Sequence, residues 1–283
     1  MDLKGIVRRR TDGLILYQFQ HLCGVPGVSH AISTRIGGVS RKPYDGLNLG
    51  EHVGDRIEDV RENRRLLSNA LGIELGNWVS AQQVHRLNLA IVDVEDRGEP
   101  RQAGGSMVPE TDAMIMERAG GEGLALATFS ADCPLVIVVH RKGRAMGVAH
   151  AGWRTTVGGI IASMVKTLCE RFALDVRDLL AGISPSIGPS CYRVGADVYR
   201  TAQSAPTRCD RFMKELDGSS EAGQPAWLFD LWQANLTQLV EAGVPREHVV
   251  PAGICNHCHT EEFFSYRVEG PTTGRYTLVA GFK

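Results

Sequence analysis

Residues 125–154 read ALATFSADCPLVIVVHRKGRAMGVAHAGWR, and this stretch decides the fold. Within it, two apolar runs at residues 135–139 and 145–149 flank a basic turn, Arg141-Lys142-Gly143. Short runs rich in β-branched residues on both sides of a glycine-containing turn predict an antiparallel hairpin. We therefore expect the rest of the chain to be organised around this hairpin.

The register of the hairpin decides which side chains meet at its open end. A two-residue turn centred on Arg141 and Lys142 pairs Cys133 directly with His150, and a turn centred on Lys142 and Gly143 moves the pairing by two residues. Directly opposed Cβ atoms lie about 5 Å apart, and diagonal neighbours about 7–8 Å. In either register the thiol and the imidazole come within reach of one shared metal ion or one shared proton. The alternative is a structural cysteine beside an unrelated loop histidine, because free cysteine is often a small core residue.

Length and composition set the class of protein. The 283 residues are enough for one large α/β domain or two smaller ones, and 43% hydrophobic residues are enough for a substantial core. A net charge of −1 gives no sign of a nucleic-acid or membrane partner. The N-terminus has no apolar signal-peptide core, and no run approaches the roughly 18 apolar residues of a membrane span. Seven scattered cysteines, an odd count, argue against a disulfide scaffold. We expect a cytoplasmic enzyme with reduced thiols, as a monomer or weak homodimer.

Several segments have the apolar periodicity of helices. The clearest is residues 55–71, where Asp55 and Glu58 fit a capping box and Gly72 supplies the C-terminal stop. Arg64 in this segment is expected on a solvated face, with its basic neighbours. Further helices are expected from just after Thr156 to about Phe172, at residues 195–202, and from the N-cap Asp230 to Gly243.

Strand patterns occupy much of the remaining chain. Residues 78–94 read as one long strand or as two strands broken at Gln82-Gln83-Val84-His85. The other expected strands are Leu14–Phe19 (the first), residues 29–34, 111–116, 124–129, Leu179–Ile183, 249–254, 263–267 and 275–282.

Two segments offer anion-binding groups. Arg35 lies beside Gly37 and Gly38, where a guanidinium can act together with free backbone N–H groups. His150 and Arg154 lie where a strand leads into a helix, whose N-terminus supplies unpaired N–H groups and a positive dipole end. Phosphate or carboxylate would suit either place, although an arginine on the surface and a junction that binds nothing are the simpler alternatives.

Three arrangements of residues compete for the chemistry. His85, Cys133 and His150 would form a mixed nitrogen–sulfur metal site, and three such ligands with water in the fourth position are typical of catalytic zinc. Zinc lowers the pKa of bound water towards about 7. Alternatively, Cys133 would act as a nucleophile with His150 as its base. Only the hairpin links two of these three residues, so their spacing alone is weak evidence.

The third arrangement is local, and it consists of Cys255, His257, Cys258 and His259. A Cys-x-x-Cys pair with interleaved histidines could be a redox pair or half of a structural zinc site. The sequence has no second Cys-x-x-Cys, which weakens the structural zinc interpretation. A His-Cys-His triplet also occurs in multicopper oxidases, but this is the one His-x-His pair among nine histidines.

Taken together, the motifs carry a resemblance to a known family. Over roughly residues 14–282 the chain resembles the YfiH family of laccase-domain proteins, also named as purine nucleoside phosphorylases, and residues 1–13 are then an N-terminal extension. The motifs, in order, are Thr34-Arg35-Ile36-Gly37-Gly38-Val39-Ser40, Leu47-Asn48-Leu49-Gly50, Gln83-Val84-His85, Thr111-Asp112-Ala113, Ser130-Ala131-Asp132-Cys133-Pro134, Ala149-His150-Ala151-Gly152-Trp153-Arg154 and Phe263-Phe264-Ser265-Tyr266-Arg267.

The resemblance implies a single-domain, mixed-sheet α/β sandwich related to cysteine hydrolases of the cytotoxic necrotizing factor type. It implies that His85, Cys133 and His150 bind a metal, zinc or alternatively copper. It implies phosphorolysis of adenosine, inosine, guanosine and methylthioadenosine, and deamination of adenosine. Family members are also described as polyphenol oxidases and as peptidoglycan-precursor editing hydrolases.

Roles for the remaining residues follow as hypotheses. The resemblance implies that Arg35 and Asn48 lie near the pocket, and Arg35 with Arg154 would suit inorganic phosphate as co-substrate. Asp132 adjoins the thiol and could support it or carry a proton, and Cys191 is expected to face the same pocket. The expected partner is a small nucleoside.

The chain departs from the family pattern after Ile254. Cys255-Asn256-His257-Cys258-His259 stands where relatives usually show Cys-Thr and few further ligands, and residues 270–276 are less rich in glycine and arginine. The extra cysteine and histidines could form an additional metal site or be surface variation, and we favour variation. Both departures bear on substrate choice more than on the fold.

Overall fold

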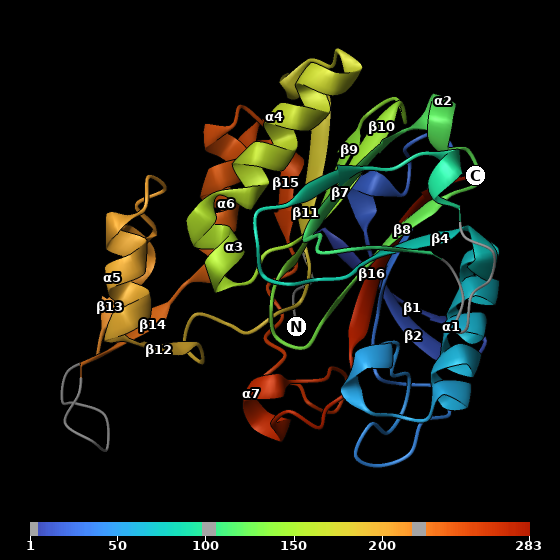
Figure 1. The fold of residues 1–283 in the computed structure, drawn as a ribbon, viewed down its shortest axis with the longest axis horizontal. Coiled ribbons are helices and arrows are strands. Elements are labelled where there is room, and N and C mark those ends of the chain that lie inside the picture. Colours follow the sequence, from blue (N-terminus) through green and yellow to red (C-terminus); the bar gives the residue numbers. More distant parts are fainter. Residues whose placement is uncertain (1–4, 98–105, 217–224) are drawn as a thin grey trace.

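The computed structural model describes residues 5–97, 106–216 and 225–283. Two β-sheets pack face to face, with helices on both outer faces (Figure 1). The chain therefore has the mixed-sheet α/β fold that the sequence predicts. The stretch of residues 125–154 contributes strands to both sheets, with residues 125–130 in one and the hairpin in the other.

The larger sheet has seven strands in the order β1-β2-β3-β16-β8-β4-β6. Strand β4 pairs in parallel with β8 and with β6, and the other pairs are antiparallel. These strands are β1 (Ile6–Thr11), β2 (Leu14–Phe19), β3 (Val28–Ser33), β4 (Trp78–Ala81), β6 (Ser106–Val108), β8 (Ala125–Ser130) and β16 (Tyr276–Phe282).

The second sheet has six strands in the order β15-β11-β9-β10-β7-β5. Its four central strands are antiparallel, and β15 and β5 pair in parallel at the two edges. These strands are β5 (Leu89–Ile91), β7 (Ala113–Glu117), β9 (Leu135–His140), β10 (Ala145–His150), β11 (Leu179–Ile183) and β15 (Val249–Pro251).

Apolar side chains fill three interfaces between the layers. Phe19 and Leu278 of the first sheet pack in one cluster with Ile137 and Met146 of the second. On the outer faces, α4 (Ile160–Phe172) and α6 (Leu231–Glu241) cover the six-stranded sheet, and α1 (Ile57–Leu71) covers the seven-stranded sheet. Both faces of β9 and β10 are therefore buried, which explains why their sequences are apolar without alternation.

A smaller unit extends from one side of the sandwich. It is a three-stranded sheet in the order β12-β14-β13, with its own apolar cluster. Its elements are β12 (Arg193–Gly195), β13 (Met213–Glu215), β14 (Ala226–Phe229) and α5 (Ala196–Ser204). Outside this unit, three short helices connect other elements: α2 (Arg118–Gly121), α3 (Trp153–Gly158) and α7 (Tyr266–Glu269).

The predicted hairpin forms as β9 and β10, in the second of the two expected registers. His150 lies opposite Leu135, so the turn is centred on Lys142 and Gly143. Gly143 has φ +64°, and a Cβ there would lie 2.2 Å from the backbone oxygen of Pro26. Only glycine suits this position, because both the backbone conformation and the space exclude a side chain.

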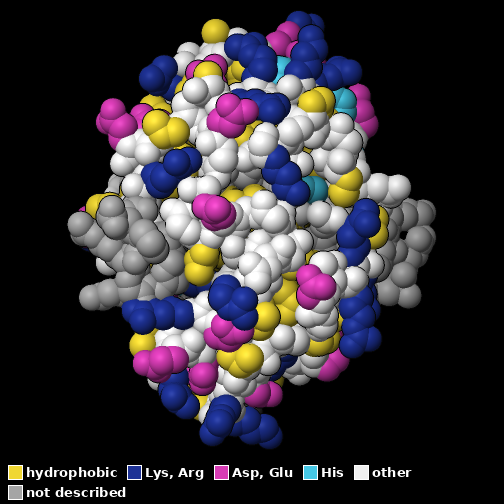
Figure 2. Space-filling view, turned by 90° about the vertical axis from the view of Figure 1, so that its right-hand side faces the viewer, with side chains coloured by type: hydrophobic (Ala, Val, Ile, Leu, Met, Phe, Trp, Pro, Cys, Tyr) yellow, Lys and Arg dark blue, Asp and Glu magenta, His cyan; other side chains and the backbone are white. Residues whose placement is uncertain are grey.

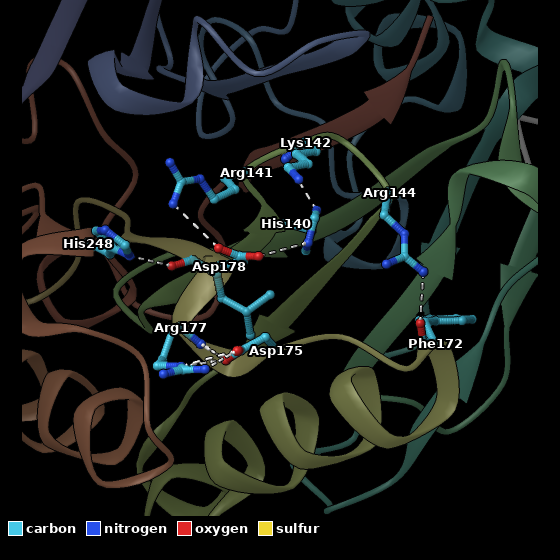
Figure 3. A network of polar contacts seen from close by, with 10 residues as sticks. His140, Arg141, Lys142, Arg144, Phe172, Asp175, Arg177, Asp178 and His248 are labelled. Carbon is cyan, nitrogen blue, oxygen red and sulfur yellow. Dashed lines mark hydrogen bonds and ion pairs between the residues drawn. The ribbon is translucent and has the colours of Figure 1, made fainter.

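Polar contacts hold the turn end of the hairpin against the segment before β11 (Figure 3). The backbone N–H of Arg141 donates to the carbonyl of Asp178 at 2.8 Å, and the Asp178 carboxylate lies 3.4 Å from the Arg141 guanidinium. The N–H of Lys142 donates to Nδ1 of His140 at 3.2 Å. These contacts fix the end of the hairpin that is far from Cys133.

Several sequence predictions are wrong in detail. Leu14–Phe19 is not the first strand, because residues before it form β1 and pair with β2 along their length. Residues 78–94 form two strands, the second of the predicted alternatives, and the two lie in different sheets. Residues 263–265 are not a strand: Phe263 and Phe264 are both fully buried in a loop, and α7 follows. Two consecutive buried rings gave this loop the apolar look of a strand.

The predicted helices also need three corrections. Asp55 does not cap α1, because its carboxylate accepts from Ser40 Oγ at 2.6 Å and from Asn48 Nδ2 at 2.9 Å. Arg64 is not solvated: it is buried and donates to the Leu49 carbonyl. The helix expected after Thr156 is interrupted near its start, because Gly159 takes a left-handed conformation at φ +84° and separates α3 from α4.

The face of the molecule on the side of α1 is drawn in Figure 2. Lys and Arg side chains are interspersed with Asp and Glu on this face, and basic side chains gather towards its top and bottom. Of the helices in the described ranges, none combines the length and the apolar character that crossing a membrane requires.

Candidate metal centre

Three side chains from distant parts of the chain converge where several strands end. Cys133 lies in the turn between β8 and β9, His150 ends β10, and His85 lies in the loop after β4. Their ligand atoms all lie within 4.8 Å of one another, and the two imidazole rings meet edge to face with centroids 4.7 Å apart. The structure thus brings together the three residues of the expected triad.

The Cys133 thiol is positioned through its own backbone. Its carbonyl accepts hydrogen bonds from Ser130 Oγ at 2.7 Å and from Tyr276 Oη at 3.2 Å. The preceding residue, Asp132, has φ +98°, an uncommon conformation for a residue other than glycine. Such backbone strain at a tight turn is often found at functional sites.

Asp112 is the functional residue that sequence reasoning missed. Its Oδ1 lies 2.9 Å from Nδ1 of His150, and its Oδ2 accepts from the backbone N–H groups of Val84 and Arg86 at 3.1 and 2.9 Å. One buried carboxylate therefore orients His150 and also holds the loop that carries His85, itself at φ +58°. The available signal was the motif Thr111-Asp112-Ala113, which places an acid directly before a buried strand.

Gly152 allows the three ligands to come together. A Cβ at this position would lie 3.1 Å from Sγ of Cys133, 3.3 Å from Cδ2 of His85 and 3.5 Å from Cε1 of His150. Gly152 itself has φ −64° and ψ 171°, which any residue can adopt. The glycine is therefore required by space and not by backbone conformation.

The electrostatics of the site favour a charged thiol. Burial disfavours the thiolate form of Cys133, but the His150 and His85 rings outweigh burial and lower the pKa of Cys133 to about 6. Burial likewise disfavours a charge on His150, but Cys133 and Asp112 outweigh it and raise the pKa of His150 to about 9. The thiol is thus ready to lose its proton at neutral pH, as a metal ligand or a nucleophile must.

The residues present fit a divalent transition metal. Asp112 holds Nδ1 of His150, which leaves Nε2 as the free donor, and carboxylate–histidine pairs of this kind are usual around bound metals. Two imidazoles and one thiolate suit zinc or copper. Because His85 is exposed, one side of the site is open to a further ligand.

Arg35 and Asn48 are both committed to contacts outside the triad. The Arg35 guanidinium pairs with Glu269 at 2.7 Å and with Asp45 at 3.2 Å. It borders an open surface hollow of about 630 Å³ that none of the three triad residues lines. The buried Asn48 amide accepts from the N–H groups of Gly50 and Arg275 at 3.0 and 2.9 Å. Both residues thus organise the loops near β16.

Asp132 and Arg154 lie beside the triad. Oδ2 of Asp132 accepts from the N–H of Arg267 at 2.7 Å, and its buried Oδ1 has no hydrogen-bond partner in the described parts of the chain. Burial raises the pKa of Asp132. Arg154 is exposed over the Trp153 ring at 4.3 Å and forms no ion pair with another described residue. Cys191 is placed elsewhere, with Sγ 3.4 Å from Sγ of Cys258.

Comparison with known proteins identifies the family of this chain. Residues 29–283 match the family model described as multi-copper polyphenol oxidoreductase laccase. The chain belongs to this laccase-domain family, which includes YfiH. The resemblance inferred from the motifs is therefore confirmed.

Similar members of the laccase-domain family carry nucleoside activities in their names. The chain is 36% identical over 263 residues to purine nucleoside phosphorylase YlmD of Geobacillus stearothermophilus, covering 92% of this chain and 93% of the relative. It is 33% identical to purine nucleoside phosphorylase YfiH of Escherichia coli over 88% and 91% of the two chains. Adenosine deaminase RL5, from an unknown prokaryotic organism, is 31% identical to the chain over 252 residues, covering 89% of this chain and 92% of that relative.

Solved structures of relatives have the same fold. The crystal structure of YlmD from Geobacillus stearothermophilus superimposes with a TM-score of 0.83 at 33% identity, covering 97% of this chain and 98% of the other. A Bacillus licheniformis YfiH protein gives a TM-score of 0.86 at 29% identity, covering 98% and 99%. These coverages extend the shared architecture over nearly the whole chain.

Proposed function

We propose that the protein is a zinc-dependent purine nucleoside enzyme. It would carry out phosphorolysis of adenosine, inosine, guanosine and methylthioadenosine, and hydrolytic deamination of adenosine. The observation that carries the proposal is the convergence of His85, Cys133 and His150, supported by Asp112, in a chain whose relatives are named for these reactions.

The residues that would hold zinc are His85, Cys133 and His150. When bound, zinc supplies Lewis-acid activation of water or of a leaving group at neutral pH. Asp112 keeps the Nδ1 side of His150 occupied, so that the ring offers Nε2 to the site. Gly152 leaves the three side chains enough room to approach one another.

Charged groups beside the triad are suited to the co-substrate and to proton transfer. Arg267, whose backbone N–H binds Asp132, and Arg154, four residues after His150, are both exposed, and a guanidinium binds phosphate oxygens well. Because Arg35 is paired with Glu269 and Asp45, we assign the phosphate-binding role to Arg154. The unpartnered Oδ1 of Asp132 can exchange a proton with a departing purine or with ammonia.

Zinc is preferred to copper because of the ligand inventory. Multicopper oxidation needs several separate His-x-His pairs, and the sequence contains one, His257 and His259. A single mixed site of two histidines and one cysteine with an open side is the usual arrangement of catalytic zinc. Copper phenol oxidation therefore stays the weaker alternative.

The proposal is tested with adenosine as substrate and the metal content known. Purified protein is analysed for zinc and copper and then incubated with adenosine, with and without inorganic phosphate. Inosine formed without phosphate indicates deamination, and adenine with ribose 1-phosphate indicates phosphorolysis. We expect both products from zinc-containing protein.

A matched pair of cysteine variants makes the test specific. Cys133→Ala should lose both activities and the zinc of the triad, whereas Cys23→Ala, which removes an exposed thiol elsewhere, should keep them. Full activity in Cys133→Ala would refute the proposal.

A cysteine amidohydrolase is the second candidate. Asp112, His150 and Cys133 lie in the order acid, base and nucleophile, which is the arrangement of thiol hydrolases. A relation to cysteine hydrolases of the cytotoxic necrotizing factor type would fit this candidate. Its substrate would be an aminoacyl bond in a peptidoglycan precursor.

Metal removal separates the two candidates. An amidohydrolase that uses Cys133 as nucleophile keeps its activity in the presence of a chelator and loses it on thiol alkylation. A zinc nucleoside enzyme loses its activity to the chelator and regains it when zinc is added.

A further inference from the structure

A second group of sulfur atoms lies outside the triad. The thiols of Cys191, Cys255 and Cys258, here called the thiol cluster, all lie within 4.8 Å of one another. Cys191 precedes β12, and the other two lie in the loop between β15 and α7 (Figure 1). Neither loop alone contains all three thiols, so the cluster exists only because the fold brings the loops together.

Two backbone turns present these cysteines. The N–H of Cys191 donates to the carbonyl of Gly188 at 2.9 Å, and the N–H of Cys258 donates to the carbonyl of Cys255 at 3.2 Å. A parallel bridge between Ser186 and Cys255 joins the two turns. The positions of the thiols are therefore set by hydrogen-bonded backbone.

Gly188 brings a backbone donor to one of the sulfur atoms. Its N–H donates to Sγ of Cys255 at 3.1 Å, and a Cβ on Gly188 would lie 3.1 Å from the same sulfur. An N–H group directed at sulfur favours the thiolate form, which is the form that binds metals. The glycine therefore permits a contact that supports a charged ligand.

We propose that Cys191, Cys255 and Cys258 form a second metal site, which binds a thiophilic d10 cation, Zn²⁺ or Cu(I). Binding forms three metal–sulfur bonds and releases the protons of the three thiols. In a tetrahedral zinc site with Zn–S bonds of about 2.3 Å, the sulfur atoms lie about 3.8 Å apart. The Sγ atoms of Cys191 and Cys258 are 3.4 Å apart, close to that spacing.

A disulfide explains the arrangement of the three thiols less well than a bound metal ion does. It would join two of the sulfur atoms and leave the third unused, although all three converge. A metal uses all three thiols, and the exposed position of Cys258 leaves room for water as a fourth ligand of zinc. Cu(I) is satisfied by the three thiolates alone.

The thiol cluster also connects to the wall of the triad. Tyr192 follows Cys191 in the chain, and the Arg267 guanidinium lies 5.1 Å from its ring. The backbone N–H of Arg267 binds Asp132, the neighbour of Cys133. A cation in the cluster would thus fix a loop that borders the triad, as a structural and not a catalytic metal.

Metal stoichiometry tests the proposal on the full chain. Reduced protein is saturated separately with Zn²⁺ and, under anaerobic conditions, with Cu(I); excess metal is removed, and bound metal is measured per chain. We expect two equivalents in the wild type, one in Cys258→Ser and two in Cys23→Ser, since Cys23 is also exposed but lies outside the cluster. Retention against a graded chelator shows which of the two cations binds more tightly.

Cobalt gives an independent readout of the ligands. The near-ultraviolet sulfur-to-cobalt band grows with the number of thiolates bound, and the cluster supplies three of the four thiolates in the two sites. The band should fall to about one quarter in Cys258→Ser. Gly188→Ala retains every thiol but crowds Cys255, and it should release the second metal at a lower chelator concentration than the wild type.

Three outcomes would overturn the proposal. These are bound metal in the wild type that Cys258→Ser retains in full with both cations, two equivalents in Cys258→Ser, and a Cys191–Cys258 disulfide found by differential alkylation of protein prepared without oxidant. Circular dichroism of each variant shows whether it is folded, and Gly188→Ala keeps the test valid if Cys258→Ser is not.

Discussion

The triad and the thiol cluster are both sulfur-containing groups on loops, yet they differ in every property that matters for catalysis. The triad combines two histidines with one cysteine, and a buried carboxylate, Asp112, orients it. The thiol cluster contains only sulfur, lies partly exposed and is held by backbone turns. A mixed site with an open position suits reaction chemistry, and an all-sulfur site suits structural binding.

The comparison teaches that supporting contacts distinguish the two groups better than the ligands do. Asp112 connects His150 to the loop of His85, so the geometry of the triad depends on one side chain. Among the described residues, no hydrogen bond joins a carboxylate to a sulfur atom of the thiol cluster.

His150→Ala should have the largest effect on activity. Removal of this ligand, which also pairs with Asp112, should lower kcat/KM for adenosine by about 10³-fold in both reactions. Steady-state kinetics by chromatography of the products checks this. Cys258→Ser is the control from the other group and should stay within about twofold of the wild type. Equal losses of kcat/KM in the two variants would contradict the functional distinction between the triad and the thiol cluster.

Acid should destabilise the fold itself through His30 and so limit the pH range in which the sites can be compared. Burial, with a smaller contribution from His21, lowers the pKa of His30 to about 4, and its Nε2 accepts from the N–H of Phe19 at 2.9 Å. Between pH 6.5 and 4 the unfolded chain binds a proton that the folded chain excludes, so stability falls as the pH falls. The expected loss is roughly 3 kcal/mol.

Urea unfolding at several pH values measures this effect. His30→Gln keeps an acceptor for Phe19 but has no titrating group, so its stability should fall less steeply over the same range. Parallel curves for the two proteins would show that His30 is not responsible.

Asp112→Asn should weaken the triad and leave the thiol cluster unchanged. Loss of the carboxylate that orients a metal-binding histidine usually costs about 10–100-fold in metal affinity. Competition with a chelator should show this loss for one of the two zinc equivalents. Asp175→Asn is the control, because that carboxylate is engaged with exposed Arg177 far from both groups. Weakening of both equivalents by Asp112→Asn would contradict the independence of the sites.

Gly152→Ala should have the smallest of these effects. The new Cβ crowds Cys133 and His85 by a few tenths of an ångström without straining the backbone, so zinc affinity of the triad should fall about tenfold. Gly76→Ala serves as the control, since no heavy atom lies within 4 Å of a Cβ there. Unchanged affinity in Gly152→Ala would show that the triad has more freedom than its geometry suggests.

Local sequence patterns predicted most of the elements but not their neighbours. The hairpin, β2, α6 with its Asp230 cap, and the stop of α1 at Gly72 all follow from near neighbours in the chain. The capping box at Asp55 failed because a distant loop competes for the same carboxylate. The prediction that Arg64 lies on a solvated face failed for a similar reason, because its partner Leu49 belongs to another segment.

For the two sites as well, local sequence patterns predicted some features and missed those that depend on distant contacts. The hairpin register brought Cys133 and His150 to one end of the sheet, and the family resemblance added His85. The dual role of Asp112 depends on contacts across 26 to 38 residues of sequence, and no local pattern reports such contacts. The same holds for Cys191, whose partner Cys258 is 67 residues away.

By itself, the sequence determined the secondary structure around the hairpin, the α/β class and the residue types that carry the chemistry, because these depend on short-range periodicity and turn conformation. Only the tertiary structure decided which thiols share a site. It placed Cys133 with two histidines and a buried acid, and Cys191 with two further cysteines. The physical reason is that ligand sets form where strand ends and loops meet, and those meetings are fixed by the packing of the two sheets.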